Sequence, residues 1–579
     1  MHLAKKETET PVPATGFSRR DFIKGGVLAG VAGGVGLGAA YFGYGASVPN
    51  PVRVGFIGTG DEGGVLIGAI NPTYIDVVAI ADIRPYNVHR AFHGDDSSEN
   101  TRVVRPGLMK KYGYATEQQA KRHIDVYEDG YESLLNDPNV EAVIIALPLH
   151  LHAPAAIAAM KKGKHVLCEK LMAYNVGQCK EMAQAAKQTG RLLAVGHQRH
   201  YSILYDNAAE TIRRGLIGQV HHIRAQWFRG NQPGKDTWQP QLPDKEMQKQ
   251  LVGYEKNAVQ ALKKLDELQS RKPPAWDAET EVNRELASFS RRQKELLLRD
   301  KDVKAADYGY VAKQLNGKDI SALEELIRWR LWDRTGGGLM AELGSHQLDA
   351  ASIFVSAMFE DKKEGHKTVK RKVHPLTVTA SGGRHIFPHD RDIEDHVYCM
   401  YEFPAPGYYS DIDKRTIGDK NKKVVVSYSS INGNGFGGYG EVVMGTKGTL
   451  IVEREQEMSL IGGEDKSATT VQAAKGGGPA LDTTESGGPK AARKLGGGGP
   501  VSRVYTEEME HWAWCIRNPS PENKPRCHPQ VALADAVIAL VSNIAMRDPH
   551  QKGRVEFRPE WFDIDNPATP EADLAKVKA

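Results

Sequence analysis

The sequence predicts an α/β protein whose amino-terminal part is a doubly wound parallel sheet. Two observations predict it. An apolar run, Val52 to Ile57, passes directly into the glycine-rich turn Gly58 to Gly63. Further short apolar runs then alternate with segments of helical periodicity as far as Gly196. This alternation is typical of β-α-β units, in which consecutive strands are parallel and helices cover both faces of the sheet.

The glycine-rich turn has the G-x-G-x-x-G spacing of a dinucleotide site. Gly58 allows a tight turn, Gly60 lets the backbone approach a pyrophosphate, and Gly63 lets the next helix, Val65 to Ala69, pack on the sheet. A second strand, Ile75 to Ala81, ends in Asp82, where such a fold places an acid on the ribose hydroxyls. The predicted cofactor-binding residues here are Gly58, Thr59, Gly60, Asp61, Glu62, Gly63, Asp82 and Arg84.

The residues after the second strand bear on the choice of cofactor. Asp82 favours NAD, because its charge would repel a 2′-phosphate. Arg84 could instead contact that phosphate, so NADP stays open.

Three later predicted strands are each followed by a stretch that contains polar residues. They are Ala142 to Ala146, Lys164 to Cys168 and Leu192 to Gly196. Because the carboxyl ends of parallel strands meet at one crevice, the residues that follow them are expected to share a site. The residues expected at this site are His152, Lys170 and His197. Around the same strand ends, the predicted cofactor-binding residues are Leu147, Pro148, His152, Glu169 and Lys170.

The amino terminus and the composition limit the partners. Basic and acidic residues number 76 and 72, so nothing in the composition indicates a nucleic-acid partner. Ser18–Lys24, followed by the weakly apolar run Gly25 to Ala46, has the pattern of a twin-arginine leader. The predicted location is periplasmic, or otherwise exported. No clear cleavage site precedes Val52, so an uncleaved membrane anchor stays open.

The spacing of the cysteines and histidines does not predict a metal site. The five cysteines are sparse and form no CxxC pair. His150 with His152, and His221 with His222, lack a carboxylate or a cysteine at ligand spacing. No metal is therefore expected at either histidine pair.

The predicted domains are a leader over 1–50, the dinucleotide domain over 51–200 and a second domain over 201–579. Alternating strands are expected in the second domain from HHIRAQWF onward, and a helix over Gln530 to Met546 closes it. The charge-rich segment 235–328 is predicted as a helical insertion, and the glycine-rich segment 462–500 as a surface loop.

The stretches GFIGTGDEG, AIAD, ALPLHLHAPAAIAAMKKGKHVLCEK, GHQRHYS and TGGGLMAELGSHQLDAASIF together resemble the Gfo/Idh/MocA oxidoreductases, the group of glucose-fructose oxidoreductase and inositol 2-dehydrogenase. The resemblance covers most of Val52 to Tyr201 and returns in patches to about Val541. It implies a Rossmann domain, then an α/β domain with a large open, mostly antiparallel sheet. It also implies a homo-oligomer, since that sheet often forms the family's subunit contact.

The same resemblance implies the catalytic residues. Lys170 matches the lysine of the family's E-K-P motif, beside nicotinamide and the substrate hydroxyl, although Leu171 replaces the proline. Glu342 and His346 match the family's D-x-x-x-H pattern, with His346 as acid or base and the carboxylate positioning it. Their spacing, with Asp349, places three side chains on one helical face. The candidate substrate contacts are His197, Arg199, His200, Tyr201 and Asp349.

These features predict an exported, NAD-dependent oxidoreductase acting on a secondary alcohol of a sugar or polyol. A tightly bound cofactor is expected, because no dependable pool of free NAD exists outside the cytoplasm. Two alternatives stay open. One is a redox-neutral glycosidase that oxidises a sugar, eliminates the glycoside, adds water and reduces again. The other is a non-catalytic NAD- or sugar-binding protein.

Overall fold

The computed structural model describes residues 37–271, 277–364, 367–455, 457–462, 468–473, 479–483 and 504–575. The predicted twin-arginine motif, Ser18–Lys24, lies outside the described residues, as does the first part of the apolar run that follows it.

The first domain is built on a parallel six-stranded sheet. Its order is β3 (Asp125–Tyr127), β2 (Ile75–Ala81), β1 (Val52–Ile57), β4 (Ala142–Ile145), β5 (His165–Cys168) and β6 (Leu193–Val195). All residues of β1 except Arg53 are buried, because helices cover both faces of the sheet. The doubly wound sheet is thereby confirmed, with strand bounds within one or two residues of the expected ones.

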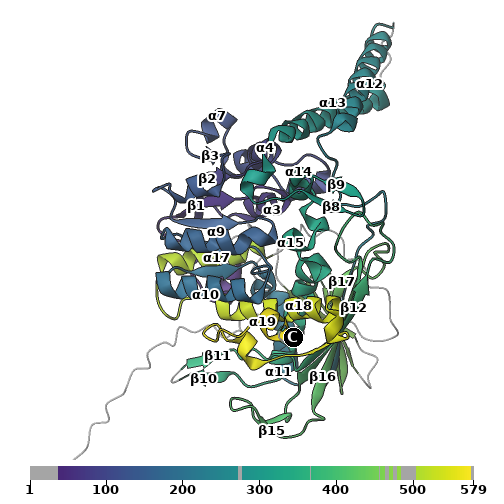
Figure 1. Cartoon of the computed structure of the whole chain (residues 1–579). Coiled ribbons are helices and arrows are strands. Elements are labelled where there is room, and N and C mark those ends of the chain that lie inside the picture. Colours follow the sequence, from purple (N-terminus) through teal and green to yellow (C-terminus); the bar gives the residue numbers. More distant parts are fainter. Residues whose placement is uncertain are drawn as a thin grey trace, which may run out of the picture.

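Helices cover the two faces of this sheet in separate groups. One face packs against α8 (Tyr131–Leu135), α9 (His152–Lys161) and α10 (Val176–Thr189). The other packs against α3 (Asp61–Ala69), α4 (Pro85–His93), α6 (Gly107–Tyr112) and α17 (Tyr505–Arg517). Helix α17 comes from near the carboxyl end of the chain, so the first domain is completed by a late segment (Figure 1).

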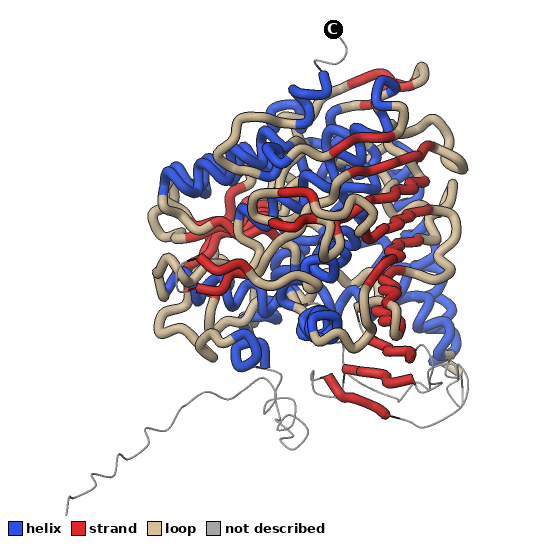
Figure 2. The backbone as a smooth tube through the Cα atoms, turned by 90° about the horizontal axis from the view of Figure 1, so that it is seen from below, coloured by secondary structure: helices blue, strands red, loops and turns tan. Residues whose placement is uncertain are grey.

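The second domain is built on a ten-stranded sheet, which runs as a ladder along one side of the molecule (Figure 2). Its order is β21 (Pro479–Thr483), β20 (Ala468–Ala473), β19 (Glu457–Gly462), β18 (Gly448–Glu453), β17 (Tyr439–Gly445), β7 (Val220–Phe228), β16 (Lys423–Ile431), β13 (His396–Pro404), β12 (Thr377–Gly383) and β22 (Arg554–Glu556). Among the described strands of this second sheet, β7 and β16 are the one pair that runs parallel. In β16 every second residue is buried, as expected for a sheet covered on one face.

Two helices cover that face and form the core between the sheets. They are α16 (Ser345–Ser356) and α18 (Pro529–Arg547). Helix α18 is long and apolar enough to cross a membrane, but most of it is buried inside the protein. It is therefore a core helix, and it confirms the expected closing helix.

The segment 235–328 contains two long helices, as predicted. Helices α12 (Lys245–Gln269) and α13 (Ala278–Leu298) pack on each other and project from the body as an arm (Figure 1). Asp244 and Asp277 cap their amino ends by accepting backbone N–H groups. After the arm, the chain returns to the first domain through the short turns η3 (Arg299–Asp302) and η4 (Ala305–Tyr308).

Shorter elements complete the chain: α2 (Leu37–Phe42), α5 (Glu99–Val104), α7 (Glu117–Ala120), η1 (Leu149–Leu151), η2 (Gln198–Tyr201), α11 (Ile203–Arg213), β8 (Lys313–Leu315), β9 (Lys318–Ile320), α14 (Ala322–Ile327), η5 (Trp329–Leu331), α15 (Asp333–Gly336), η6 (Met340–Gly344), β10 (Lys362–Glu364), β11 (Lys367–Val369), β14 (Tyr409–Asp411), β15 (Thr416–Ile417), η7 (Pro549–Gln551), η8 (Pro559–Phe562) and α19 (Pro570–Ala575).

The segment 462–500 differs from the predicted loop. It contains β20 and β21, which extend the large sheet beyond β19. An edge strand offers unpaired backbone groups, and the Thr- and Val-containing stretch Ala468–Ala473 has the composition to pair with it. The glycines on either side obscured this stretch in the sequence.

Residues 37–50, placed in the predicted leader, pack on the folded body. The Tyr44 hydroxyl donates to a Glu510 carboxylate oxygen of α17 at 2.8 Å. Arg517 donates to the Asn50 carbonyl at 2.7 Å. The folded part of the chain therefore begins before residue 51.

Candidate active site

A cavity of about 1010 Å³ lies between the two domains. This is at the upper end of the usual size for a small-molecule site, about 300–1,000 Å³. The carboxyl ends of β1, β2, β4 and β5 line it on one side, and η6, α16 and β7 line it on the other. Of the predicted site residues, the cavity-lining ones are Gly58, Gly60, Asp61, Glu62, Asp82, Arg84, Leu147, Pro148, Glu169, Lys170, Glu342 and His346.

The glycine-rich turn has the geometry that a pyrophosphate site requires. Gly58 has φ of +85°, a conformation that favours glycine. A side chain at Gly63 would collide with the Gly58 carbonyl, because α3 starts directly against the turn. The helix begins at Asp61, earlier than the predicted Val65, so its free N–H groups face the cavity.

Asp82 is held at the end of β2 by several donors. Its carboxylate accepts the backbone N–H of Thr59 at 2.8 Å and that of Arg84 at 2.9 Å. The Asn87 amide donates to the same group at 3.1 Å. Thr59 itself does not line the cavity but fixes this acid, which is placed to accept ribose hydroxyls.

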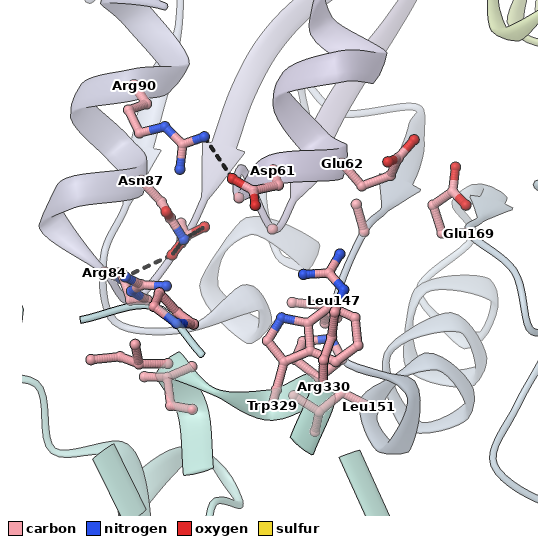
Figure 3. A pocket seen from close by; sticks show the side chains of 18 of the residues that line it. Asp61, Glu62, Arg84, Asn87, Arg90, Leu147, Leu151, Glu169, Trp329 and Arg330 are labelled. Carbon is pink, nitrogen blue, oxygen red and sulfur yellow. Dashed lines mark hydrogen bonds and ion pairs between the residues drawn. The ribbon is translucent and has the colours of Figure 1, made fainter. Parts of the chain in front are cut away.

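Acids at the start of α3 are balanced by arginines. Asp61 pairs with Arg90 at 2.7 Å and with Arg105 at 3.3 Å. Burial alone would raise the pKa of Asp61, but these two guanidinium groups hold it below its ordinary value. Figure 3 shows the Arg90–Asp61 pair at the cavity wall, with Arg330 extending toward the same region. The glycine turn, the neutralised Asp61 and the fixed Asp82 together fit NAD.

At the other end of the cavity, Lys170 faces the second domain. Its ammonium group donates to the Glu342 carbonyl at 2.8 Å and lies 3.8 Å from the Glu342 carboxylate. Arg330 donates to the other carboxylate oxygen at 2.9 Å. Burial would raise the pKa of Glu342, but Lys170, Arg330 and Arg229 lower it to about 2. Glu342 is therefore an anion that holds the lysine in place.

The predicted common face of Glu342, His346 and Asp349 is altered by a π-helical turn. This turn, η6, spans Met340–Gly344, and α16 begins only at Ser345. In a π turn the hydrogen bonds run from i to i+5, so residues four apart no longer stack. Among the described residues, the Glu342 carboxylate pairs with Lys170 and Arg330 rather than with His346.

His346 lines the cavity next to aromatic side chains. Its ring centroid lies 5.4 Å from that of Trp227 on β7. Burial, together with the positive charges of Lys170 and Arg199, lowers the pKa of His346 well below its ordinary value. The imidazole is therefore neutral near pH 7, with a ring nitrogen able to accept a proton.

His152 lies behind the cavity wall rather than in it. One ring nitrogen is 2.8 Å from the Leu171 carbonyl, and the other is 2.7 Å from the Leu147 carbonyl. The ring thus links the turns after β4 and β5, and it positions the cavity-lining residues Leu147 and Lys170. The Lys170–Leu171 peptide bond is cis.

Five predicted substrate contacts do not line the cavity: His197, Arg199, His200, Tyr201 and Asp349. His200 is partly buried, and the other four are buried. Asp349 lies 3.0 Å from His200 and 3.4 Å from the Lys372 ammonium. Arg199 donates to Glu455 at 2.6 Å, and Glu455 does line the cavity. Arg199 can therefore support a cavity-lining residue, but none of the five forms the cavity wall.

The sequence did not identify several cavity-lining residues. Trp227, Arg229 and Tyr439 come from the large sheet, and Trp329, Arg330 and Tyr310 come from the segment around the insertion. One signal was present: Trp329-Arg330 lies shortly before the glycine run at Gly336, which precedes the catalytic motif. No spacing rule marks the others.

Comparison with known proteins gives partial matches. The inositol 2-dehydrogenase/D-chiro-inositol 3-dehydrogenase of Lactiplantibacillus plantarum is 33% identical over 164 residues, which are 28% of this chain and 45% of that protein. A glycosyl hydrolase family 109 protein of Solibacter usitatus is 28% identical over 209 residues, 35% of this chain and 44% of that protein. The chain thus spans less than half the length of these curated relatives.

Among solved structures, an NAD binding oxidoreductase from Klebsiella pneumoniae covers 88% of this chain and 99% of its own, at 19% identity and a TM-score of 0.49. Residues 52–197 match the model of the oxidoreductase family with an NAD-binding Rossmann fold. This stretch contains the glycine turn, Asp82 and Lys170. The amino-terminal domain of this chain has a Rossmann fold and is similar to the NAD-binding domain of the Gfo/Idh/MocA oxidoreductases.

Proposed function

We propose that this protein is an NAD-dependent oxidoreductase that acts on a secondary alcohol of a sugar or polyol. One observation carries the proposal: Lys170 of the Rossmann domain and His346 of the second domain line the same cavity as the dinucleotide turn. The relative from Lactiplantibacillus plantarum, named as an inositol dehydrogenase, supports this substrate class.

Lys170 and His346 have different roles at the alcohol group. The Lys170 ammonium donates a hydrogen bond to the carbinol oxygen and stabilises the negative charge that develops there. The neutral His346 imidazole accepts the hydroxyl proton. When bound, NAD supplies the two-electron oxidant. Glu342 lies between the Lys170 ammonium and the Arg330 guanidinium, and we call these three alternating charges the charge chain. The charge chain keeps Lys170 directed at the reacting oxygen.

Turnover by the full chain tests this proposal. The protein would be mixed with NAD and a panel of polyols and sugars, and the absorbance of reduced nicotinamide would be followed. We expect at least one polyol to give an increase that Lys170→Ala abolishes. If nucleotide binds but no alcohol in a broad panel changes the absorbance, the proposal fails, and a redox-neutral glycosidase or a binding protein is left.

A second candidate is a redox-neutral glycosidase, favoured by the relative from Solibacter usitatus that is named as a glycosyl hydrolase family 109 protein. Lys170 and His346 could serve a transient oxidation equally well. Aryl glycosides separate the two activities, because a glycosidase releases the aglycone without net formation of NADH.

We propose that the chain is exported, because Ser18–Lys24 has the twin-arginine pattern. Cell fractionation with and without Arg19→Lys and Arg20→Lys tests this. Retention of the double variant in the cytoplasm supports export by this route, whereas equal distribution of the two proteins contradicts it.

A further inference from the structure

Asp300 belongs to the inserted segment but contacts the Rossmann domain. It lies on η3, where the chain returns from the projecting arm, and its side chain is fully buried. The Arg84 guanidinium donates to one carboxylate oxygen at 2.9 Å. The backbone N–H of Tyr86 donates to the other at 3.1 Å. The carboxylate is therefore held in place against Arg84, just beyond the end of β2. Burial raises the pKa of Asp300 above its ordinary value, whereas Arg84 and the Tyr86 N–H favour its charged form.

This contact is at the end of the cavity that Asp82 and Arg84 line, which we call the adenosine end. Asp82 and Arg84 line the cavity there, and Figure 3 shows Arg84 beside Asn87, far from Glu169 at the other end. The insertion adds lining residues to the same region, namely Gln293, Leu297, Tyr308 and Tyr310. The returning insertion thus forms part of the wall around the predicted ribose site.

Arg84 is the nearby cation that a 2′-phosphate would need. A dinucleotide fold that takes NADP places an arginine on this phosphate, whereas an acid at the end of the second strand favours NAD. In this chain Asp300 already neutralises Arg84, and the side chain of Arg84 is only 16% exposed. Freeing it would leave a buried carboxylate without its partner, which is costly.

We propose that Asp300 is a specificity-determining residue, through which the inserted segment selects NAD against NADP. It acts by withholding Arg84 from a 2′-phosphate and by placing a second negative charge near Asp82. This inference rests on the proposed function only in taking the cavity as a dinucleotide site. The selection is made by a residue outside the Rossmann motif.

The test compares the affinities of the full chain for NAD and NADP by titration calorimetry. Asp300→Asn keeps the size of the side chain and an acceptor for the Tyr86 N–H, but it removes the charge that holds Arg84. We expect the affinity for NADP relative to NAD to rise about tenfold or more, the size of a charge-assisted contact. Adding Arg84→Gln to this variant should abolish the gain.

Asp302→Asn is the matched control, because Asp302 lies on the same turn and is exposed. It should leave both affinities unchanged. A folded Asp300→Asn protein with the wild-type ratio of affinities overturns the inference.

Arg84→Gln alone gives an independent test if Asp300→Asn fails to fold. With Asp300 in place, Arg84 is already unavailable, so this variant should not selectively weaken NADP binding. A selective loss of NADP affinity would show that Arg84 serves the phosphate, and it would overturn the inference. A wild-type protein that binds neither nucleotide contradicts the proposed function instead.

Discussion

The two ends of the cavity are built in different ways. At the catalytic end, Lys170 follows a strand of the first sheet, and Glu342 and His346 come from one motif of the second domain. At the adenosine end, Asp82 comes from a motif, but Arg84 is paired with Asp300, 216 residues later in the chain. Under the two proposals, motif residues carry out the chemistry, whereas a segment without a motif selects the cofactor.

The largest effect is expected at the catalytic end. Lys170→Ala removes the hydrogen bond to the reacting oxygen, so kcat should fall by about 10²–10⁴-fold. NAD affinity should change little, because the adenosine end is intact. Steady-state kinetics and a binding titration measure the two quantities. Lys161→Ala, an exposed lysine at the end of α9, is the control. Wild-type kcat in Lys170→Ala would show that the lysine has no part in the chemistry.

Glu342→Gln should have the next largest effect. Losing this charge frees Lys170 and leaves Arg330 unpaired, at a cost of about 1.5–3 kcal/mol. That corresponds to a loss of kcat of about ten- to hundredfold. Glu342→Asp, which restores the residue usual in the family, should keep most of the activity. Equal kinetics for wild type and Glu342→Gln would argue against the charge chain.

Asp82→Asn probes the opposite end. We expect the Kd for NAD to rise about tenfold, because a neutral amide binds the ribose hydroxyls less well than a carboxylate. At saturating NAD, kcat should stay near the wild-type value. If Asp82→Asn loses kcat but keeps its affinity for NAD, the proposed separation of cofactor binding at one end from chemistry at the other would be contradicted. Asp76→Asn, near the start of the same strand, serves as the comparison.

Glu342 also predicts a dependence of stability on pH. Its pKa is lowered from 4.5 to about 2, so its stabilising contribution is complete above pH 4.5. The contribution is lost as the pH falls through about 2. The difference in unfolding free energy between wild type and Glu342→Gln should shrink across this window. A constant difference would mean that the carboxylate is not ionised in the native protein.

The smallest effect is expected in the inserted arm. Val259 is half exposed and lies within α12, one of the two helices that form the projecting arm (Figure 1). Val259→Ser should change the unfolding free energy by less than about 0.5 kcal/mol. NAD affinity should also be unchanged, since no residue of α12 is among the described residues that line the cavity. Thermal melting and a binding titration measure these two quantities. A shift in NAD affinity would show that residues of the arm take part in cofactor binding.

Much of the first domain could be predicted from the sequence because its signals are local. Strand β1 is apolar along its length, and the glycine turn follows it at once. The rule that parallel strands end at one crevice predicted one site for His152, Lys170 and His197. Lys170 lines the cavity, but His152 and His197 do not. The rule therefore located the strand ends, but it did not give the direction of every side chain that follows them.

The remaining features depend on contacts between distant segments. Asp300 was one acid among many in a charged insertion, and only the return of the chain to Arg84 distinguishes it. The family resemblance predicted that Glu342 positions His346, but with the π turn at Met340–Gly344 the Glu342 carboxylate pairs with Lys170 and Arg330 instead. His200 and Tyr201 follow a strand end, yet neither lines the cavity. Spacing rules give no information on such reorientation.

The most direct measurement is the identity of the nucleotide held by the full chain. The protein would be denatured without added cofactor, and the released nucleotide identified and quantified by mass spectrometry. The account predicts NAD or NADH, close to one per chain, with no NADP. A protein that releases no nucleotide and also fails to bind added NAD or NADP would contradict the account.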